Sequence, residues 1–117
     1  PAAPADPKRL LGITSGNLEI AGRRIYRSQR ADRFAGLDGM RCPGVDYPKV
    51  LTGKAHFTVY GRCLPWDHLP GIMLLREAGW VDRHLDGSTY DVADLVGGVM
   101  SAPGRDLLDE IVRRLTT

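Results

Sequence analysis

Stretches with the two-residue repeat of a β-strand alternate along this chain with stretches that have the 3.6-residue repeat of a helix. The clearest helix pattern follows Ser101, where leucine, isoleucine and valine form one continuous apolar stripe as far as Leu115. The clearest strand pattern covers residues 55–60, in which Phe57 and Val59 share one face and more polar side chains share the other. Such an alternation indicates helices packed on a sheet. The sequence therefore predicts an α/β (α+β layered) domain.

Prolines, glycines and aspartates divide the chain into its elements. The predicted strands cover residues 9–14, 55–60, 80–84 and 98–101. The predicted helices cover residues 27–36, 46–53, 67–79 and a last stretch from Ser101 to Leu115. Asp46, Asp67 and Ser101 stand at the starts of three of these helices, where a side-chain oxygen can cap free backbone N–H groups. Asp86 and Gly87 predict a turn between the last two strands.

Length and composition limit the class of protein. A chain of 117 residues can bury one core but not two, and we expect residues 9–117 to form it after a disordered tail at residues 1–8. With 43% hydrophobic and 26% charged residues, long disorder and a disulfide scaffold are excluded. No apolar run approaches the roughly 20 residues of a membrane span, and no signal pattern opens the chain, so the expected location is cytoplasmic. Cys42 and Cys63 are expected as free thiols.

Positive charge is concentrated at the front of the chain. Residues 1–33 carry seven Lys or Arg against three acidic residues, whereas residues 34–117 carry nine against eleven. The arginines concerned are Arg23, Arg24, Arg27, Arg30 and Arg33. They could form a patch that faces phosphate groups, or a solvated arginine-rich face. We favour the solvated face, and expect no nucleic acid partner, because no aromatic platform accompanies the charges.

Asp67 is the first candidate for a chemical role. It follows Pro65 and Trp66 at the head of a predicted helix, in the positive field of the helix N-terminus. A carboxylate there either caps its helix or reaches outward as a ligand for Mg²⁺, which prefers one or two protein carboxylates together with water and phosphate oxygens. The residues alone favour the cap, since one aspartate is not a metal site by itself.

Four segments together resemble one known family. They are residues 65–71 (PWDHLPG), 74–79 (LLREAG), 86–90 (DGSTY) and 97–103 (GGVMSAP). Their order and spacing resemble the C-terminal part of the inositol monophosphatase family over about residues 40–116. That family has a Trp-Asp-x-Ala-Ala-Gly signature, a helix ending in Glu-Ala-Gly-Gly, a turn with Asp-Gly, and a strand leading into the last helix. The resemblance implies the C-terminal half of the inositol-monophosphatase-like sugar phosphatase fold, a mixed sheet flanked by helices.

The same resemblance implies a Mg²⁺-dependent phosphomonoesterase acting on the phosphate ester of a polyol, a sugar or a nucleotide. The aspartate of the family's Trp-Asp pair is a metal ligand, which here is Asp67. Tyr60 and Arg62 are expected at the end of a strand facing the site, as substrate contacts. His68, which stands next to Asp67, could steer the substrate phosphate or a metal-bound water, but we favour a partly exposed residue of the first helical turn. Tyr60 stands seven positions before Asp67, where inositol phosphatases place an acidic residue, so inositol phosphate itself is not assigned as the substrate.

Two upstream motifs of the family, a Glu-Glu pair and an Asp-Pro-Ile/Leu-Asp-Gly-Thr loop, do not occur in this sequence. Residues 85–88 (LDGS) imitate the end of that loop, but Arg83 replaces its first aspartate, so we interpret them as a surface turn. A single aspartate cannot fix the metal ions of such an enzyme. We therefore expect a C-terminal piece that is inactive alone. Its expected partners are the missing N-terminal half, whose absence would expose an apolar face, and a second copy in a homodimer.

Two other interpretations compete with a phosphatase. Zinc is not expected, because no two of the possible ligands stand at a Cys-x-x-Cys or His-x-x-x-His spacing. Those possible ligands are Cys42, His56, Cys63 and His68. The alternative function is a non-catalytic interaction or regulatory domain whose basic N-terminal third meets an anionic partner.

Overall fold

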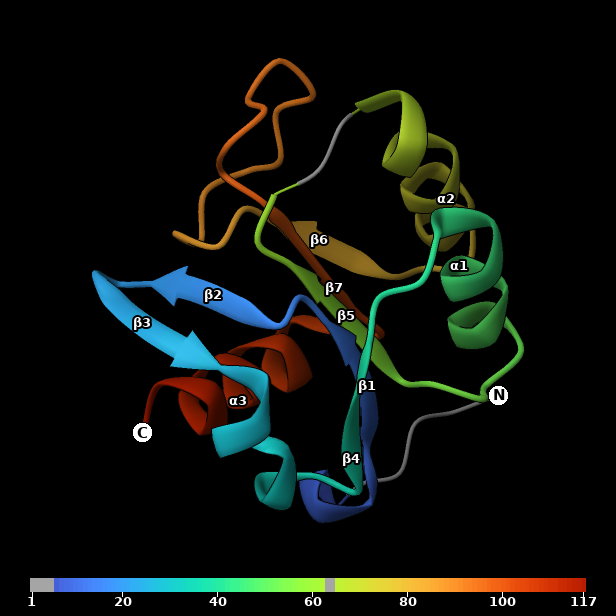
Figure 1. The fold of residues 1–117 in the computed structure, drawn as a ribbon. Helices are drawn as coiled ribbons and strands as arrows, with labels where there is room; N and C mark the ends of the chain where they lie inside the picture. Colours follow the sequence, from blue (N-terminus) through green and yellow to red (C-terminus); the bar gives the residue numbers. More distant parts are fainter. Residues whose placement is uncertain (1–5, 63–64) are drawn as a thin grey trace.

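A five-stranded mixed sheet forms the centre of the protein (Figure 1). The computed structural model describes residues 6–62 and 65–117. The strand order is β4-β1-β5-β7-β6. β1 is parallel to β4 and β5, whereas β7 is antiparallel to β5 and β6. The strands are β1 (Leu11–Thr14), β4 (Gly36–Gly39), β5 (Phe57–Tyr60), β6 (Val81–Arg83) and β7 (Val99–Ala102). This sheet and its helices confirm the predicted fold class, including the mixed sheet.

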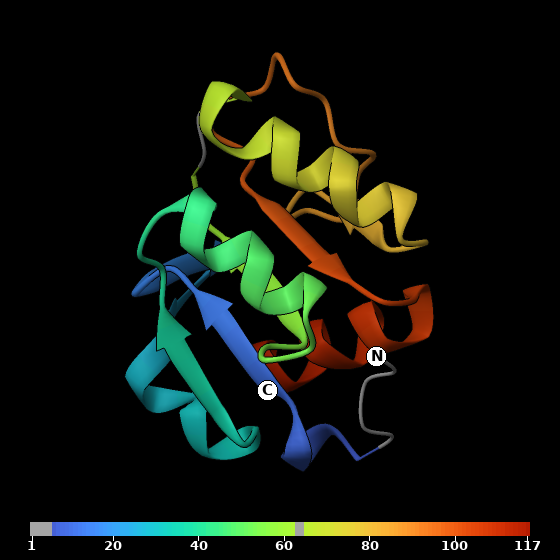
Figure 2. The same cartoon turned by 90° about the vertical axis from the view of Figure 1, so that its right-hand side faces the viewer.

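Each face of the sheet is covered by a different layer (Figures 1 and 2). The helices α1 (Pro43–Leu51) and α2 (Pro65–Glu77) cover one face. The other face carries α3 (Arg105–Thr116) and a hairpin of β2 (Asn17–Ile20) and β3 (Arg23–Tyr26). The side chains of β5 divide as predicted, because Phe57 and Val59 join the core beneath α3 and Tyr60 joins the core beneath α1 and α2. Both faces of β5 are therefore buried.

The helix predicted over residues 27–36 is wrong. The β2–β3 hairpin ends at Tyr26, and the residues after it form two short 3₁₀ helices, η2 (Arg27–Gln29) and η3 (Ala31–Arg33), before β4. Ala21 and Gly22 both have positive φ, 54° and 75°, which is the backbone of the two-residue turns that join twisted antiparallel strands. Each hairpin strand is so short that only one or two apolar side chains point inward, which hides the strand period from the sequence.

The three predicted helix caps are also wrong. α1 begins at Pro43 and α2 at Pro65, so Asp46 and Asp67 lie inside the first turns of their helices. Proline is favoured at the first helical position, because its missing N–H would have no partner there. Ser101 lies within β7, and Gly104 precedes α3. The apolar stripe of α3 is confirmed, since Leu108, Ile111 and Leu115 are buried in the core.

Arginines from the front of the chain bind the end of α3. Arg30 Nε donates to the carbonyl of Leu115 at 2.9 Å, and Arg33 Nη1 donates to that of Arg114 at 2.8 Å. Arg23 Nη1 donates to the carbonyl of Thr116. The last carbonyls of a helix lack partners within it, and its C-terminus favours positive charge. These three arginines therefore stabilise the fold, a role that neither the phosphate-facing patch nor the solvated face predicted.

The remaining expectations concern the tail, the thiols and the membrane. Residues 1–5 of the expected tail lie outside the described residues, and Pro7–Arg9 form a 3₁₀ turn, η1, capped by the Asp6 side chain. Cys42 is an exposed free thiol, as predicted, whereas Cys63 lies outside the described residues. Within the described part of the chain, every helix is too short or too polar to cross a bilayer.

Candidate functional site

The parallel strands β1, β4 and β5 end at one edge of the sheet, and the candidate residues follow them there. Ser15 follows β1, Met40 follows β4, and Gly61 and Arg62 follow β5. The chain then enters α1 from β4 and α2 from β5, so both helices begin near this edge (Figures 1 and 2). Ligands of open α/β sheets commonly bind beyond the carboxyl ends of parallel strands. A ligand site is therefore expected at this edge.

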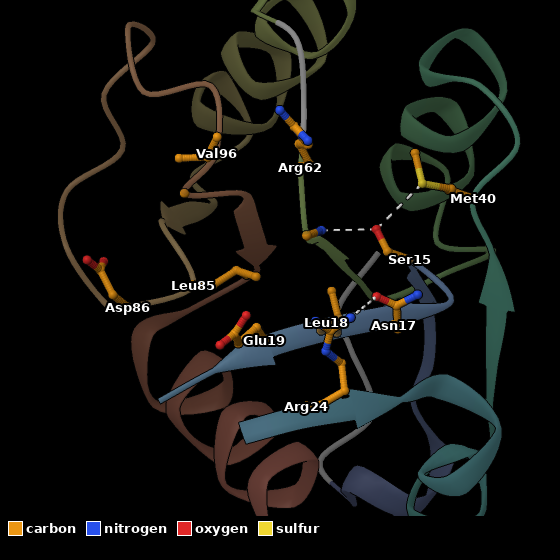
Figure 3. A pocket seen from close by; sticks show the side chains of 12 residues that line it. Ser15, Asn17, Leu18, Glu19, Arg24, Met40, Arg62, Leu85, Asp86 and Val96 are labelled. Carbon is orange, nitrogen blue, oxygen red and sulfur yellow. Dashed lines mark hydrogen bonds between the residues drawn. The ribbon is translucent and has the colours of Figure 1, made fainter. Parts of the chain in front are cut away.

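A cavity of about 670 Å³ opens between this edge, the β2–β3 hairpin and the loop after β6 (Figure 3). Arg62 and Arg24 bring positive charge to it, and Glu19 and Asp86 bring negative charge. Ser15 connects two strand ends, because its hydroxyl oxygen accepts the Gly61 N–H at 3.0 Å. The cavity thus has an ordered polar wall and charges of both signs.

The turn at Asp86 and Gly87 is confirmed as a surface feature. Gly87 has a φ of 87°, and the Asp86 carboxylate accepts the Ser88 N–H at 2.8 Å. The Ser88 hydroxyl donates to the same oxygen, and these two hydrogen bonds hold the pKa of Asp86 below its ordinary value. The apparent copy of the family's catalytic loop is accordingly a turn that is exposed at residues 86–88, and its Leu85 and Asp86 line the cavity.

Asp67 is exposed in the first turn of α2 and faces a different hollow. It lines a groove of about 310 Å³ between α1 and α2, whose other walls are mainly apolar, including Leu51 and Leu74. The structure therefore does not bring Asp67 and Arg62 into one cavity.

The resemblance implies a bound Mg²⁺ ion, and the side chain of Asp67 supplies part of what such an ion needs. The Asp67 carboxylate is a hard oxygen ligand of the kind that Mg²⁺ prefers, and it is open to solvent. Across residues 6–62 and 65–117, however, no three His, Cys, Asp or Glu side chains come together as a metal site. Asp67 fits as one ligand of a site that needs further carboxylates from elsewhere.

Tyr60 and His68 lie where no substrate can touch them. Tyr60 is 0% exposed and His68 is 4% exposed, beneath α1 and α2. Their rings pack with centroids 4.7 Å apart. Burial lowers the pKa of His68, while the nearby carboxylates of Asp67 and Asp46 act in the opposite direction. The expected partly exposed position of His68 is wrong, because this residue points into the core and its neighbour Asp67 points out of it.

Two further residues of α1 complete this buried group. Asp46 is a carboxylate that is only 2% exposed, and it accepts the backbone N–H of Arg41 at 3.1 and 3.3 Å and the Tyr60 hydroxyl at 3.4 Å. The Tyr47 hydroxyl lies 3.0 Å from His68 Nδ1 in a hydrogen bond. Sequence reasoning interpreted Asp46 as a cap and gave Tyr47 no role, since neither stands in a pattern that indicates burial.

Comparison with known proteins identifies the architecture. No protein-family model and no curated protein matches the sequence. Among solved structures, the Thermotoga maritima IMPase superimposes on 98% of this chain with a TM-score of 0.76 at 20% sequence identity. The chain has the fold of part of an inositol monophosphatase. The inositol monophosphatase from Anabaena gives a TM-score of 0.71 at 19% identity, and the extragenic suppressor protein suhB from Bartonella henselae gives 0.75 at 15%.

The match covers only part of the larger proteins. This chain corresponds to 43% of the Thermotoga protein and 46% of the other two, so it spans less than half of an inositol monophosphatase. The predicted resemblance is confirmed at the level of the fold, with a coverage consistent with a C-terminal part.

Proposed function

We propose that the chain is the C-terminal part of a Mg²⁺-dependent phosphomonoesterase that hydrolyses a polyol, sugar or nucleotide phosphate. The observation that carries this proposal is the superposition of 98% of the chain on part of an inositol monophosphatase. Another similar structure, that of SaIMPase-II, contains bound inositol monophosphate, which supports a phosphate ester as the substrate class. Because less than half of such an enzyme is present, we expect this chain alone to be inactive.

In this proposal Asp67 supplies one carboxylate ligand, and the rest of the enzyme supplies the others. Bound Mg²⁺ would activate a water molecule and neutralise charge on the phosphoryl group. Arg62, exposed beside the large cavity, would bind an anionic group of the substrate. Tyr60 and His68 take no direct part, because both are covered by protein.

The alternative, a non-catalytic domain with a basic N-terminal third, has less support. Its anionic partner would need the front arginines, but Arg23, Arg30 and Arg33 donate to carbonyls of α3. No specific observation in the described part of the chain favours it.

The test is phosphate release by the complete parent protein, with and without Mg²⁺, from a panel of polyol, sugar and nucleotide phosphates. Asp67→Asn should abolish turnover. Asp106→Asn is the matched control, because Asp106 is also an exposed aspartate in the first turn of a helix, α3. Turnover that survives Asp67→Asn, or robust hydrolysis by the 117-residue chain alone, would overturn the proposal.

A further inference from the structure

A buried polar cluster lies directly beneath the exposed Asp67. It consists of Asp46, Tyr47, Tyr60 and His68, and all four are at most 4% exposed. Aspartate and histidine are rarely buried in this way without hydrogen-bond partners, because removing a polar group from water costs free energy that only such partners offset. Here the partners come from different elements, so the cluster joins parts of the chain that are distant in sequence.

Its hydrogen bonds connect four segments. The Asp46 carboxylate on α1 holds the backbone N–H of Arg41, before that helix, and the hydroxyl of Tyr60, at the end of β5. The Tyr47 hydroxyl on α1 holds His68 on α2. Ring packing closes the group, since the Tyr47 ring lies 6.0 Å from that of Tyr60 and 5.8 Å from that of His68.

The contact between α1 and α2 leaves little freedom at this point. Gly71 lies about one turn after His68, and a Cβ added to it would lie 2.3 Å from atoms of the Tyr47 ring. Tyr47 is therefore pressed against the α2 backbone while its hydroxyl holds His68. These two contacts fix the rotation and height of the first turn of α2 relative to α1.

We infer that Tyr47 and His68 are positioning residues, which fix the first turn of α2 and thereby the direction of the Asp67 carboxylate. This inference rests on the proposed function only for what Asp67 does, not for how it is held. His68 and Asp67 are consecutive, and consecutive helical side chains point about 100° apart. A rotation that released His68 from Tyr47 would turn Asp67 by the same angle.

The first test uses the 117-residue chain and amide hydrogen exchange. Tyr47→Phe removes the hydroxyl but keeps the ring, and we expect amides in the first two turns of α2 to exchange about tenfold faster, with those of α3 unchanged. Tyr26→Phe is the matched control, because Tyr26 is an exposed tyrosine of β3. Equal exchange in Tyr47→Phe and the unsubstituted chain would overturn the inference.

Substitution of His68 separates the hydrogen bond from simple packing. His68→Asn retains an amide group that can pair with the Tyr47 hydroxyl near the position of Nδ1, so it should largely preserve slow exchange in α2. His68→Leu fills the space without a hydrogen-bonding group and should accelerate that exchange. If His68→Asn and His68→Leu exchange equally fast, the hydrogen bond does not position the helix and the inference is wrong.

The complete enzyme distinguishes positioning from substrate contact. Tyr47→Phe should lower kcat about tenfold with little change in KM, since the bound substrate keeps its contacts while the reacting groups are misaligned. A raised KM at unchanged kcat would instead make the cluster part of the binding site and refute its positioning role. If the parent protein hydrolyses no phosphate ester, the proposed function fails, and the exchange measurements still decide whether Tyr47 and His68 hold α2.

Discussion

The arginines at the end of α3 give the most direct test of how this fold is held together. Arg30→Ala removes the guanidinium that donates to the Leu115 carbonyl at 2.9 Å. Hydrogen bonds to charged groups contribute about 1.5–3 kcal/mol. Arg30 is half-buried and the freed carbonyl can bind water, so we expect the lower part of that range or less, about 1 kcal/mol. A loss of that size lowers the Tm by about 4 °C for a domain of this length.

The assay is urea unfolding at equilibrium, followed by circular dichroism, with Arg24→Ala as the matched control. Arg24 belongs to the same basic segment, but it donates only to the Asn17 side chain on the neighbouring strand, at 3.0 Å, among the bonds described. Its substitution should change the free energy of unfolding by no more than about 0.5 kcal/mol. Combining Arg30→Ala with Arg33→Ala should cost about 2 kcal/mol, since both bind the same helix end. If Arg30→Ala is no more destabilising than Arg24→Ala, the arginines do not cap α3 and the solvated face returns as the better interpretation.

Three further predictions follow from single groups. Hydrogen bonds from neighbouring arginines of α3 lower the pKa of Glu110 to about 2, below its ordinary 4.5, so the stability it provides is complete above that ordinary value and is lost as the pH falls toward 2. In Glu110→Gln, the urea concentration at the unfolding midpoint should change less between pH 5 and pH 2 than it does in the unsubstituted chain. Burial lowers the pKa of His56, whose Nδ1 accepts an N–H of β1 at 2.9 Å, so the folded state favours the neutral ring and loses stability as the pH falls below about 6.5. His56→Asn keeps an acceptor but cannot be protonated in this pH range. It should therefore remove the part of the stability loss between pH 7 and pH 5 that His56 causes. Gly71→Ala should destabilise the protein by about 1–2 kcal/mol in urea unfolding, because overpacking against Tyr47 outweighs the helix propensity gained. Gly44→Ala meets no atom within 4 Å and should be neutral or stabilising.

The parts of the fold that could be predicted are those with a local repeat. The apolar stripe of α3 extends over three turns, and successive side chains of β5 alternate between the two cores. The repeat of each element is therefore visible in the sequence. The hairpin and the arginine caps could not be predicted in this way. Arg33 and the carbonyl of Arg114 are 81 residues apart, and no pattern in either segment indicates that they meet.

At the candidate site, too, the sequence did not reveal which side chains are buried, although the spacing of apolar residues in α2 held one indication. The sequence placed Asp67 at the head of a helix, but the exposure of a single side chain there depends on the rotation of that helix. Leu69, Ile72, Met73 and Arg76 recur at helical spacing in the sequence, but Ile72 is buried and Met73 is exposed. The buried apolar side chains of α2 are Ile72 and Leu75.

His68 lies on the same face of α2 as the buried Ile72 and Leu75, and therefore in the core. Ile72 and Leu75 lie four and seven residues after His68, which is the spacing of one helix face. A histidine on that face is covered by the sheet and must find a buried partner, which Tyr47 provides. Asp67, one position earlier, is then turned away from the core. The phase of α2 therefore assigns the two neighbours opposite roles, because the same rotation that buries the imidazole turns the carboxylate toward solvent.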